Sequence, residues 1–183
     1  MGLWDDEPEF YPTSKGVASV RSMLPLPPEL VNQIFYLAEY WGFSKSIDQD
    51  WCRFYRCEER VLRSKPIKGG DFAYPLRRVV VKMDSRDITW EQDTIDIERP
   101  EKSWTWAYLS IDNGGADGVI ARVEVVKNID VGRDYGVYRA IIEDEVFLKQ
   151  ARKGDTLSVW IKAKSPGWHI LVRWVSIEYW VAC

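Results

Sequence analysis

The stretch that decides the fold is residues 75–111, PLRRVVVKMDSRDITWEQDTIDIERPEKSWTWAYLSI. It begins with a predicted strand over residues 76–83, in which Val79, Val81 and Met83 share one side. A polar loop over residues 84–87 is expected to lead to Trp90. A second strand is predicted over residues 103–111, with aromatic rings at every second position. Side chains that repeat with a period of two indicate a half-buried antiparallel sheet.

The same alternation continues to the end of the sequence. Further strands are predicted over residues 118–128, 136–143, 156–164 and 168–181, whereas residues 146–153 fit either a helical turn or a strand. The connections between them are rich in Gly, Pro and Asp, and no helix alternates with the strands. This pattern favours a mainly β fold, an antiparallel β-sandwich, and a jelly roll suits its size.

An N-terminal helical segment precedes the predicted sandwich. Pro28 and Glu29 are typical of a helix start, and Leu30, Ile34 and Leu37 follow at helical spacing, so a helix is predicted over residues 28–41. A second short helix fits residues 48–62. We therefore expect a flexible acidic arm over residues 1–23, a helical leader over 24–64 and the β-sandwich over 65–183.

The outer faces of the late strands carry Trp160, Trp174 and Trp180, where a sandwich would usually place polar side chains. We expect the helix over residues 28–41 to cover these rings. The alternative is an exposed aromatic patch that recruits a partner.

Composition excludes several classes of function. The formal net charge of -3 gives no electrostatic argument for nucleic acid or an anionic membrane, and no apolar run is long enough to span a bilayer. The first ten residues, MGLWDDEPEF, do not resemble a signal peptide. Cys52, Cys57 and Cys183, with a single histidine in the chain, do not form a zinc pattern, so reduced thiols in the cytoplasm or nucleus are expected. We expect no metal and no cofactor.

Catalytic residues are not prominent in the sequence. His169 is the only histidine and is interpreted as structural. Four aspartates in predicted loops could serve a carbohydrate-active enzyme or bind calcium if they converge on one cleft, namely Asp84, Asp87, Asp112 and Asp117. Solvated turn residues are the favoured interpretation, and the chain is not expected to be an enzyme.

Binding is better supported, because polar loops meet tryptophans at two predicted strand ends. The candidate ligand-binding residues are Ser85, Arg86, Asp87, Trp90, Ser165 and Trp168. If both strands run in the same direction, these residues share one rim of the sandwich, where rings and polar groups suit a sugar or a peptide end. The alternative is that the rings close the end of the core. A non-catalytic recognition module for a protein or glycan ligand is therefore predicted.

Leu26-Pro27-Pro28-Glu29-Leu30, followed by Ile34 and Leu37, resembles the first helix of an F-box. That segment docks on Skp1, the adaptor of cullin ubiquitin ligases. The resemblance implies a substrate adaptor in which Leu30, Ile34 and Leu37 contact Skp1.

A larger part of the chain resembles a family of uncharacterised fungal proteins. The residues that carry this resemblance are Leu26–Leu30, Ala38–Trp41, Val79–Trp90, Ser103–Trp106, Gly154–Asp155 and Pro166–Trp168. Members pair an F-box-like N-terminal helix with a galactose-binding-like β-sandwich, which is the fold that the resemblance implies. Their Gln-Gly pair before the loop tryptophan is replaced by Ile88-Thr89 in this chain.

Overall fold

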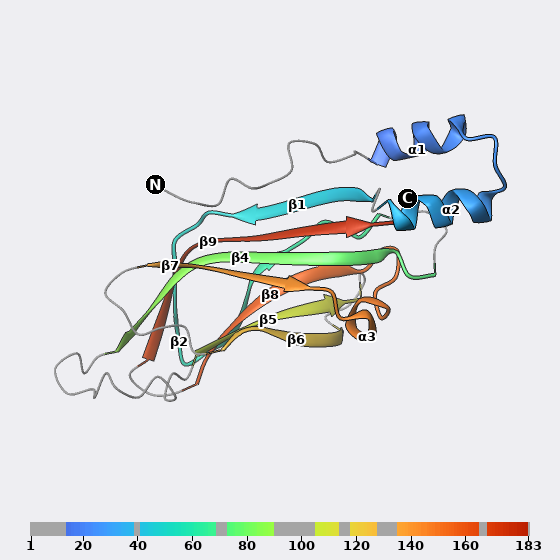
Figure 1. The fold of residues 1–183 in the computed structure, drawn as a ribbon. Helices are drawn as coiled ribbons and strands as arrows, with labels where there is room; N and C mark the ends of the chain where they lie inside the picture. The colour runs from blue at the N-terminus through green and yellow to red at the C-terminus, as the bar shows by residue number, and fades with distance from the viewer. Residues whose placement is uncertain are drawn as a thin grey trace.

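The computed structural model describes residues 14–38, 41–68, 73–89, 105–113, 118–127, 135–164 and 168–182. Two antiparallel sheets pack face to face, and the described helices lie toward one end of the sandwich, at the right of Figure 1. The predicted mainly β class, an antiparallel β-sandwich with an N-terminal helical segment, is confirmed.

The first sheet, sheet A, has the strand order β1-β9-β4-β7, and β2 also pairs with β9. Its strands are β1 (Gly42–Asp48), β2 (Cys52–Tyr55), β4 (Leu76–Thr89), β7 (Gly136–Ile142) and β9 (Trp168–Val181). The second sheet, sheet B, has the order β3-β8-β5-β6. Its strands are β3 (Glu58–Arg63), β5 (Thr105–Asp112), β6 (Val119–Lys127) and β8 (Thr156–Ala163).

The core lies between the sheets and is built by the alternation seen in the sequence. On β4, Val79, Val81 and Met83 are at most 1% exposed, and Ile161 on β8 is fully buried opposite them. From β6 to β9 successive strands belong to alternate sheets, which is a jelly-roll-like arrangement. Each crossing places apolar residues distant in sequence in one contiguous cluster.

The sandwich begins earlier than predicted. Residues 42–63 form β1, β2 and β3, so the short helix predicted over residues 48–62 is wrong, as is a purely helical leader over 24–64. β2 pairs with β9 from Cys52↔Val172 to Tyr55↔His169. Strand pairing with a distant segment overrides the weak local helix pattern, because strand preference depends on sheet context.

Three helices are described. α2 (Pro28–Leu37) starts at the predicted proline and ends earlier than the predicted Trp41. α1 (Ser14–Met23) lies in the predicted flexible arm, whose first 13 residues are outside the described part. α3 (Glu145–Leu148) resolves the ambiguous segment after residue 145, because the Asp144 side chain accepts a hydrogen bond from the Val146 amide at 2.9 Å and starts a helical turn.

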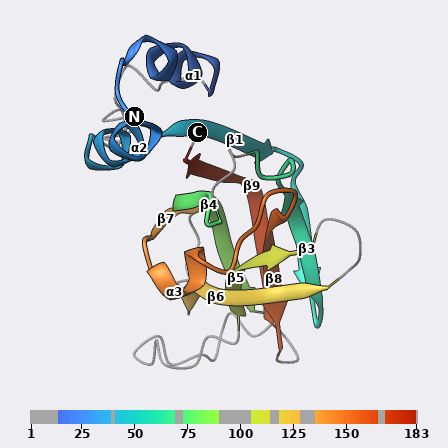
Figure 2. The same cartoon turned by 90° about the vertical axis from the view of Figure 1, so that its right-hand side faces the viewer.

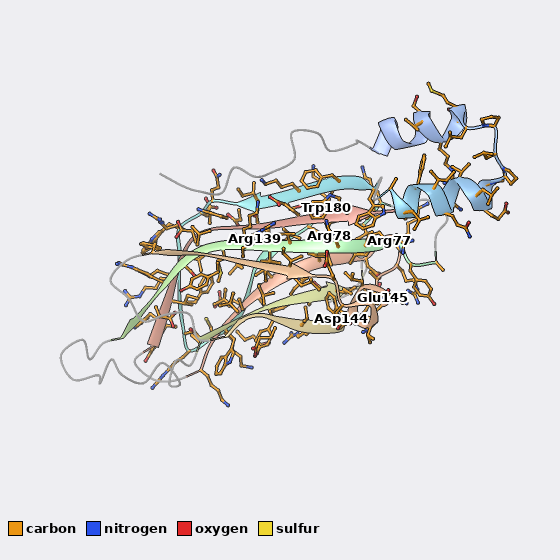
Figure 3. All side chains as sticks on the ribbon, in the orientation of Figure 1. Arg77, Arg78, Arg139, Asp144, Glu145 and Trp180 are labelled. Carbon is orange, nitrogen blue, oxygen red and sulfur yellow. The ribbon has the colours of Figure 1, made fainter. Side chains whose placement is uncertain are left out.

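The predicted helical cover over the outer tryptophans is wrong. Trp160 lies on sheet B, whereas Trp174 and Trp180 lie on sheet A, so one helix cannot cover all three. Figure 2 shows α1 and α2 beside the end of the sandwich near β1. Trp180 is instead covered by neighbours within its own sheet: its ring lies 5.2 Å from Phe43, and the Arg78 guanidinium lies 5.9 Å from its centroid (Figure 3).

Candidate functional site

The predicted polar loop after β4 is a continuation of the strand. Pairing with β9 runs to Thr89, so Ser85 and Asp87 belong to β4 and face the inside of the sandwich, where they are 0% and 1% exposed. Asp87 Oδ2 accepts a hydrogen bond of 2.6 Å from the hydroxyl of Thr105 in the opposite sheet. The prediction that these two side chains line a loop rim is therefore wrong, because they close the polar end of the core.

The two predicted rim segments do meet at the backbone. Thr89 at the end of β4 pairs with Trp168 at the start of β9. Trp90 and Ser165 lie outside the described residues, and only the backbone of Trp168 is described. The predicted proximity of the two segments is confirmed at the backbone.

Charged side chains on the outer face of β4 include Asp84 and Arg86. Asp84 and Arg86 point outward, opposite Trp174 and Leu171 of β9. A bulge in β9 inserts Arg173 between these partners, and its Nε and Nη2 both donate to Asp84 Oδ2, at 2.8 and 2.5 Å. Asp84 is 3% exposed, and its Oδ1 accepts no hydrogen bond within the described chain. The carboxylate thus fixes Arg173 through one oxygen only.

An aromatic pair adjoins these charges. The guanidinium groups of Arg173 and Arg86 lie 4.1 and 4.8 Å from the centroid of the Tyr135 ring. Tyr135 Oη accepts a hydrogen bond of 3.0 Å from Trp51 Nε1, and Trp51 is 59% exposed. We call Trp51, Asp84, Arg86, Tyr135 and Arg173 the Trp51–Arg173 surface. It presents a solvent-exposed indole, hydrogen-bonded at Nε1, beside two guanidinium groups that lie over one ring.

A second aromatic pair extends this surface along β2. Tyr55 is 42% exposed and stacks on His169, with centroids 4.5 Å apart. Arg53 Nε donates to His169 Nδ1 at 3.2 Å. Burial, together with the charge of Arg53, lowers the pKa of His169, so the imidazole is neutral at pH 7 and its Nδ1 is an acceptor. His169 supports the Tyr55 ring, in line with its predicted structural role.

The candidate carboxylates do not converge. Asp84 lies on the outer face of sheet A and Asp87 on the inner face, while Asp112 lies on the outer face of sheet B, where it accepts hydrogen bonds from Ser110 and Ser158. Asp117 is outside the described residues. The three described aspartates therefore cannot act as a catalytic pair or share one calcium ion.

The docking residues predicted on α2 are accessible. Leu30, Ile34 and Leu37 are 47%, 43% and 81% exposed. Val31 and Phe35, on the other side of the helix, are buried and pack with Leu24 in a small cluster separate from the sandwich core. The helix therefore presents an apolar face to solvent.

Other site classes find little support in the described chain. No group of three or more His, Cys, Asp and Glu side chains is placed to hold a metal ion among these residues. Burial raises the pKa of the Cys52 and Cys57 thiols, so both are protonated at neutral pH and are poor nucleophiles. Among the helices of the described residues, none has the length and apolar character needed to cross a bilayer.

Comparison with known proteins gives low structural similarity and no sequence relative. No protein-family model matches the chain, and no curated protein matches it. The enzymatically active domain of tailspike protein 4 from bacteriophage CBA120 is 10% identical with a TM-score of 0.38, over 74% of this chain and 19% of that chain. A chain of infectious bursal disease virus, Gt strain, is 9% identical with a TM-score of 0.27, over 76% of this chain and 40% of that chain. Site and function are therefore argued from the chain's own residues.

The sequence pattern predicts Arg86 and marks Asp84, but it misses Trp51, Tyr135 and Arg173. Trp51 lies in the turn between β1 and β2, in a segment predicted as helix, and Arg173 occupies the bulge of the last strand. The adjacent large residues Arg173 and Trp174 interrupt the alternation of β9, and this interruption is a signal in the sequence that could have indicated the bulge.

Proposed function

We propose that this protein is a non-catalytic recognition module and that its ligand binds on the Trp51–Arg173 surface. The observation that carries this proposal is the exposed Trp51 indole, whose Nε1–H is held by Tyr135 while its ring stays open to solvent. A fixed aromatic ring loses little conformational entropy on binding, and the adjacent guanidinium groups supply directed hydrogen bonds. A glycan, with an apolar ring face and polar edges, is the ligand class that this combination favours.

Trp51→Ala is expected to weaken glycan binding at least about tenfold, which corresponds to about 1.4 kcal/mol, because the stacking ring is removed. The measurement is a binding screen against an array of neutral and acidic oligosaccharides, followed by titration calorimetry with the best one. Tyr74→Ala is the matched control, since Tyr74 is 43% exposed and lies before β4, at the end of that strand opposite Arg86. Equal binding by both variants, or no glycan bound by the wild type, would contradict the proposal.

A second candidate function is that of an F-box-like adaptor that docks Skp1 through α2. It is favoured by one observation, the exposure of Leu30, Ile34 and Leu37 on a helix that is not covered by the sandwich. In that function the sandwich would bind the substrate protein, and the protein would act in the cytoplasm or nucleus.

The double substitution Ile34→Asp, Leu37→Asp is expected to change the free energy of unfolding by less than about 1 kcal/mol, because both side chains already contact water. If the adaptor function holds, the same variant loses Skp1 and cullin in an affinity purification analysed by mass spectrometry. Phe35→Asp is the control for a buried position of the same helix and is expected to destabilise the small cluster of Phe35, Val31 and Leu24. Failure of the wild type to recover Skp1 would remove this candidate.

A further inference from the structure

We infer that Asp84 is a positioning residue of the Trp51–Arg173 surface, which orients the exposed Trp51 ring without touching it. The Asp84 carboxylate orients Arg173, and Arg173 in turn orients Tyr135, whose hydroxyl holds the indole. This inference rests on the proposed function, because it describes how that surface is prepared for its ligand. It is carried by a continuous series of contacts that joins four separate segments of the chain.

The series begins at the bulge of β9. The register between β4 and β9 passes from Asp84↔Trp174 to Ser85↔Val172. Arg173 therefore has no partner residue on β4, and bulges of this kind commonly redirect a side chain. Arg173 Nε and Nη2 both donate to Asp84 Oδ2, at 2.8 and 2.5 Å. Because two donors of one rigid plane meet the same oxygen, the direction of the guanidinium is fixed.

The oriented guanidinium lies over the Tyr135 ring, 4.1 Å from its centroid. Tyr135 comes directly before β7 and is not among the residues of that strand that pair with β4. The position of its ring therefore depends on contacts of the side chain. The Arg173 guanidinium supplies one such contact, and the Arg86 guanidinium, 4.8 Å from the same centroid, supplies another.

The series ends at Trp51, in the turn between β1 and β2. The Asp50 amide donates to Asp48 Oδ1 at 2.9 Å and shapes the backbone of this turn. The Trp51 side chain is 59% exposed, so packing does little to orient it. Within the described residues its one hydrogen bond runs from Nε1 to Tyr135 Oη at 3.0 Å. The direction of the indole therefore depends on where Tyr135 places its hydroxyl.

The burial of Asp84 favours a positioning role over contact with a ligand. The residue is 3% exposed, and its Oδ1 has no hydrogen-bond partner in the described chain. A buried carboxylate is costly to desolvate, and apolar side chains in place of such an ion pair are often equally stable. Orientation of Arg173 explains a half-satisfied carboxylate at this position better than stability does.

The test observes the Trp51 ring in the full chain without ligand, by fluorine NMR after incorporation of fluorotryptophan. The Trp51 resonance is identified by its absence from the spectrum of Trp51→Phe. Arg173→Lys keeps a positive charge beside Asp84 but loses the planar guanidinium, so we expect the Trp51 resonance to shift or broaden. Asp84→Asn is expected to have the same effect, because Arg173 loses its ionic anchor.

Arg78→Lys is the matched control for this measurement. Arg78 is also an arginine of sheet A with an ion pair, to Glu143, and its guanidinium also lies over aromatic rings, those of Trp41 and Trp180 (Figure 3). It lies toward the opposite end of β4 from Asp84. We expect Arg78→Lys to change the resonances of its own two tryptophans and to leave that of Trp51 unchanged.

Tyr135→Phe tests whether the effect passes through the tyrosine, because it removes only the hydroxyl that accepts from Trp51. In this background Arg173→Lys is expected to cause no further change at Trp51, which is the non-additivity of residues that act in series. An effect of Arg173→Lys that persists in full in the Tyr135→Phe background would overturn the inference.

Two further outcomes would also overturn the inference. One is a Trp51 resonance that Arg173→Lys leaves unchanged in a protein that circular dichroism shows to be folded. The other is a Trp51 resonance that Arg78→Lys changes equally, since it would then respond to any substitution in sheet A. Because no ligand is present, these outcomes are independent of glycan binding, which the comparison with Trp51→Ala decides for the proposed function.

Discussion

Ile161→Ala is expected to lower the free energy of unfolding by about 2–5 kcal/mol. Ile161 is fully buried on β8, in the cluster that joins the two sheets, and its partner across the ladder, Ala107, is also fully buried. The substitution removes apolar contacts and leaves a cavity that two paired strands cannot close. Denaturant unfolding followed by tryptophan fluorescence measures the effect, because the chain has ten tryptophans.

Ile141→Ala is the matched control for this prediction. Ile141 is the same residue type on a strand of sheet A, but it lies on the outer face of β7 and is 51% exposed. We expect its substitution to cost less than about 1 kcal/mol. A similar loss of stability in both variants would mean that β7 is covered and that the assignment of inner and outer faces is incorrect.

The strands of the sandwich could be predicted from the sequence wherever burial of one face requires apolar and polar residues to alternate. Leu157, Val159 and Ile161 on β8 are buried, and the predicted strand over residues 168–181 matches β9 at both ends. Such strands can be recognised from their own residues, because the period of two is the same whichever strand they pair with. The prediction failed for β1 to β3, where exposed and charged residues such as those of Glu58–Arg63 carry no clear period.

The candidate site was harder to predict because it depends on pairing between distant strands. Ser85, Arg86 and Asp87 are adjacent in sequence, but once β4 continues through them, two of the three face the core. Only a residue at an alternate position, Arg86, stays on the surface. The partners that complete the site, Trp51 and Tyr135, come from connections 84 residues apart that meet through one hydrogen bond. No local pattern in a single sequence predicts that Trp51 and Tyr135 come into contact.

Arg173→Met is expected to lower the free energy of unfolding by about 1–3 kcal/mol, because it leaves the almost fully buried Asp84 carboxylate without its cationic partner. Asp84 Oδ2 would lose both of its donors, and Oδ1 has none within the described residues. The cost stays below that of a fully buried ion pair, since the Arg173 side chain is 50% exposed and water can replace part of the contact.

The double variant Asp84→Asn, Arg173→Met distinguishes two contributions to the loss of stability. One is the cost of an unpaired buried carboxylate, and the other is the packing lost with the Arg173 side chain. Once the carboxylate is neutral, removal of Arg173 should cost much less than it does in the wild type, and the difference is the coupling energy of the pair. Lys149→Met is the control, because Lys149 pairs with Glu145 at an exposed position and its loss should cost under about 0.5 kcal/mol. Additive effects at Asp84 and Arg173 would show that the carboxylate does not depend on the arginine. Strong coupling would show that Asp84 holds Arg173 in place before any ligand arrives, which is the preorganisation that a recognition surface needs.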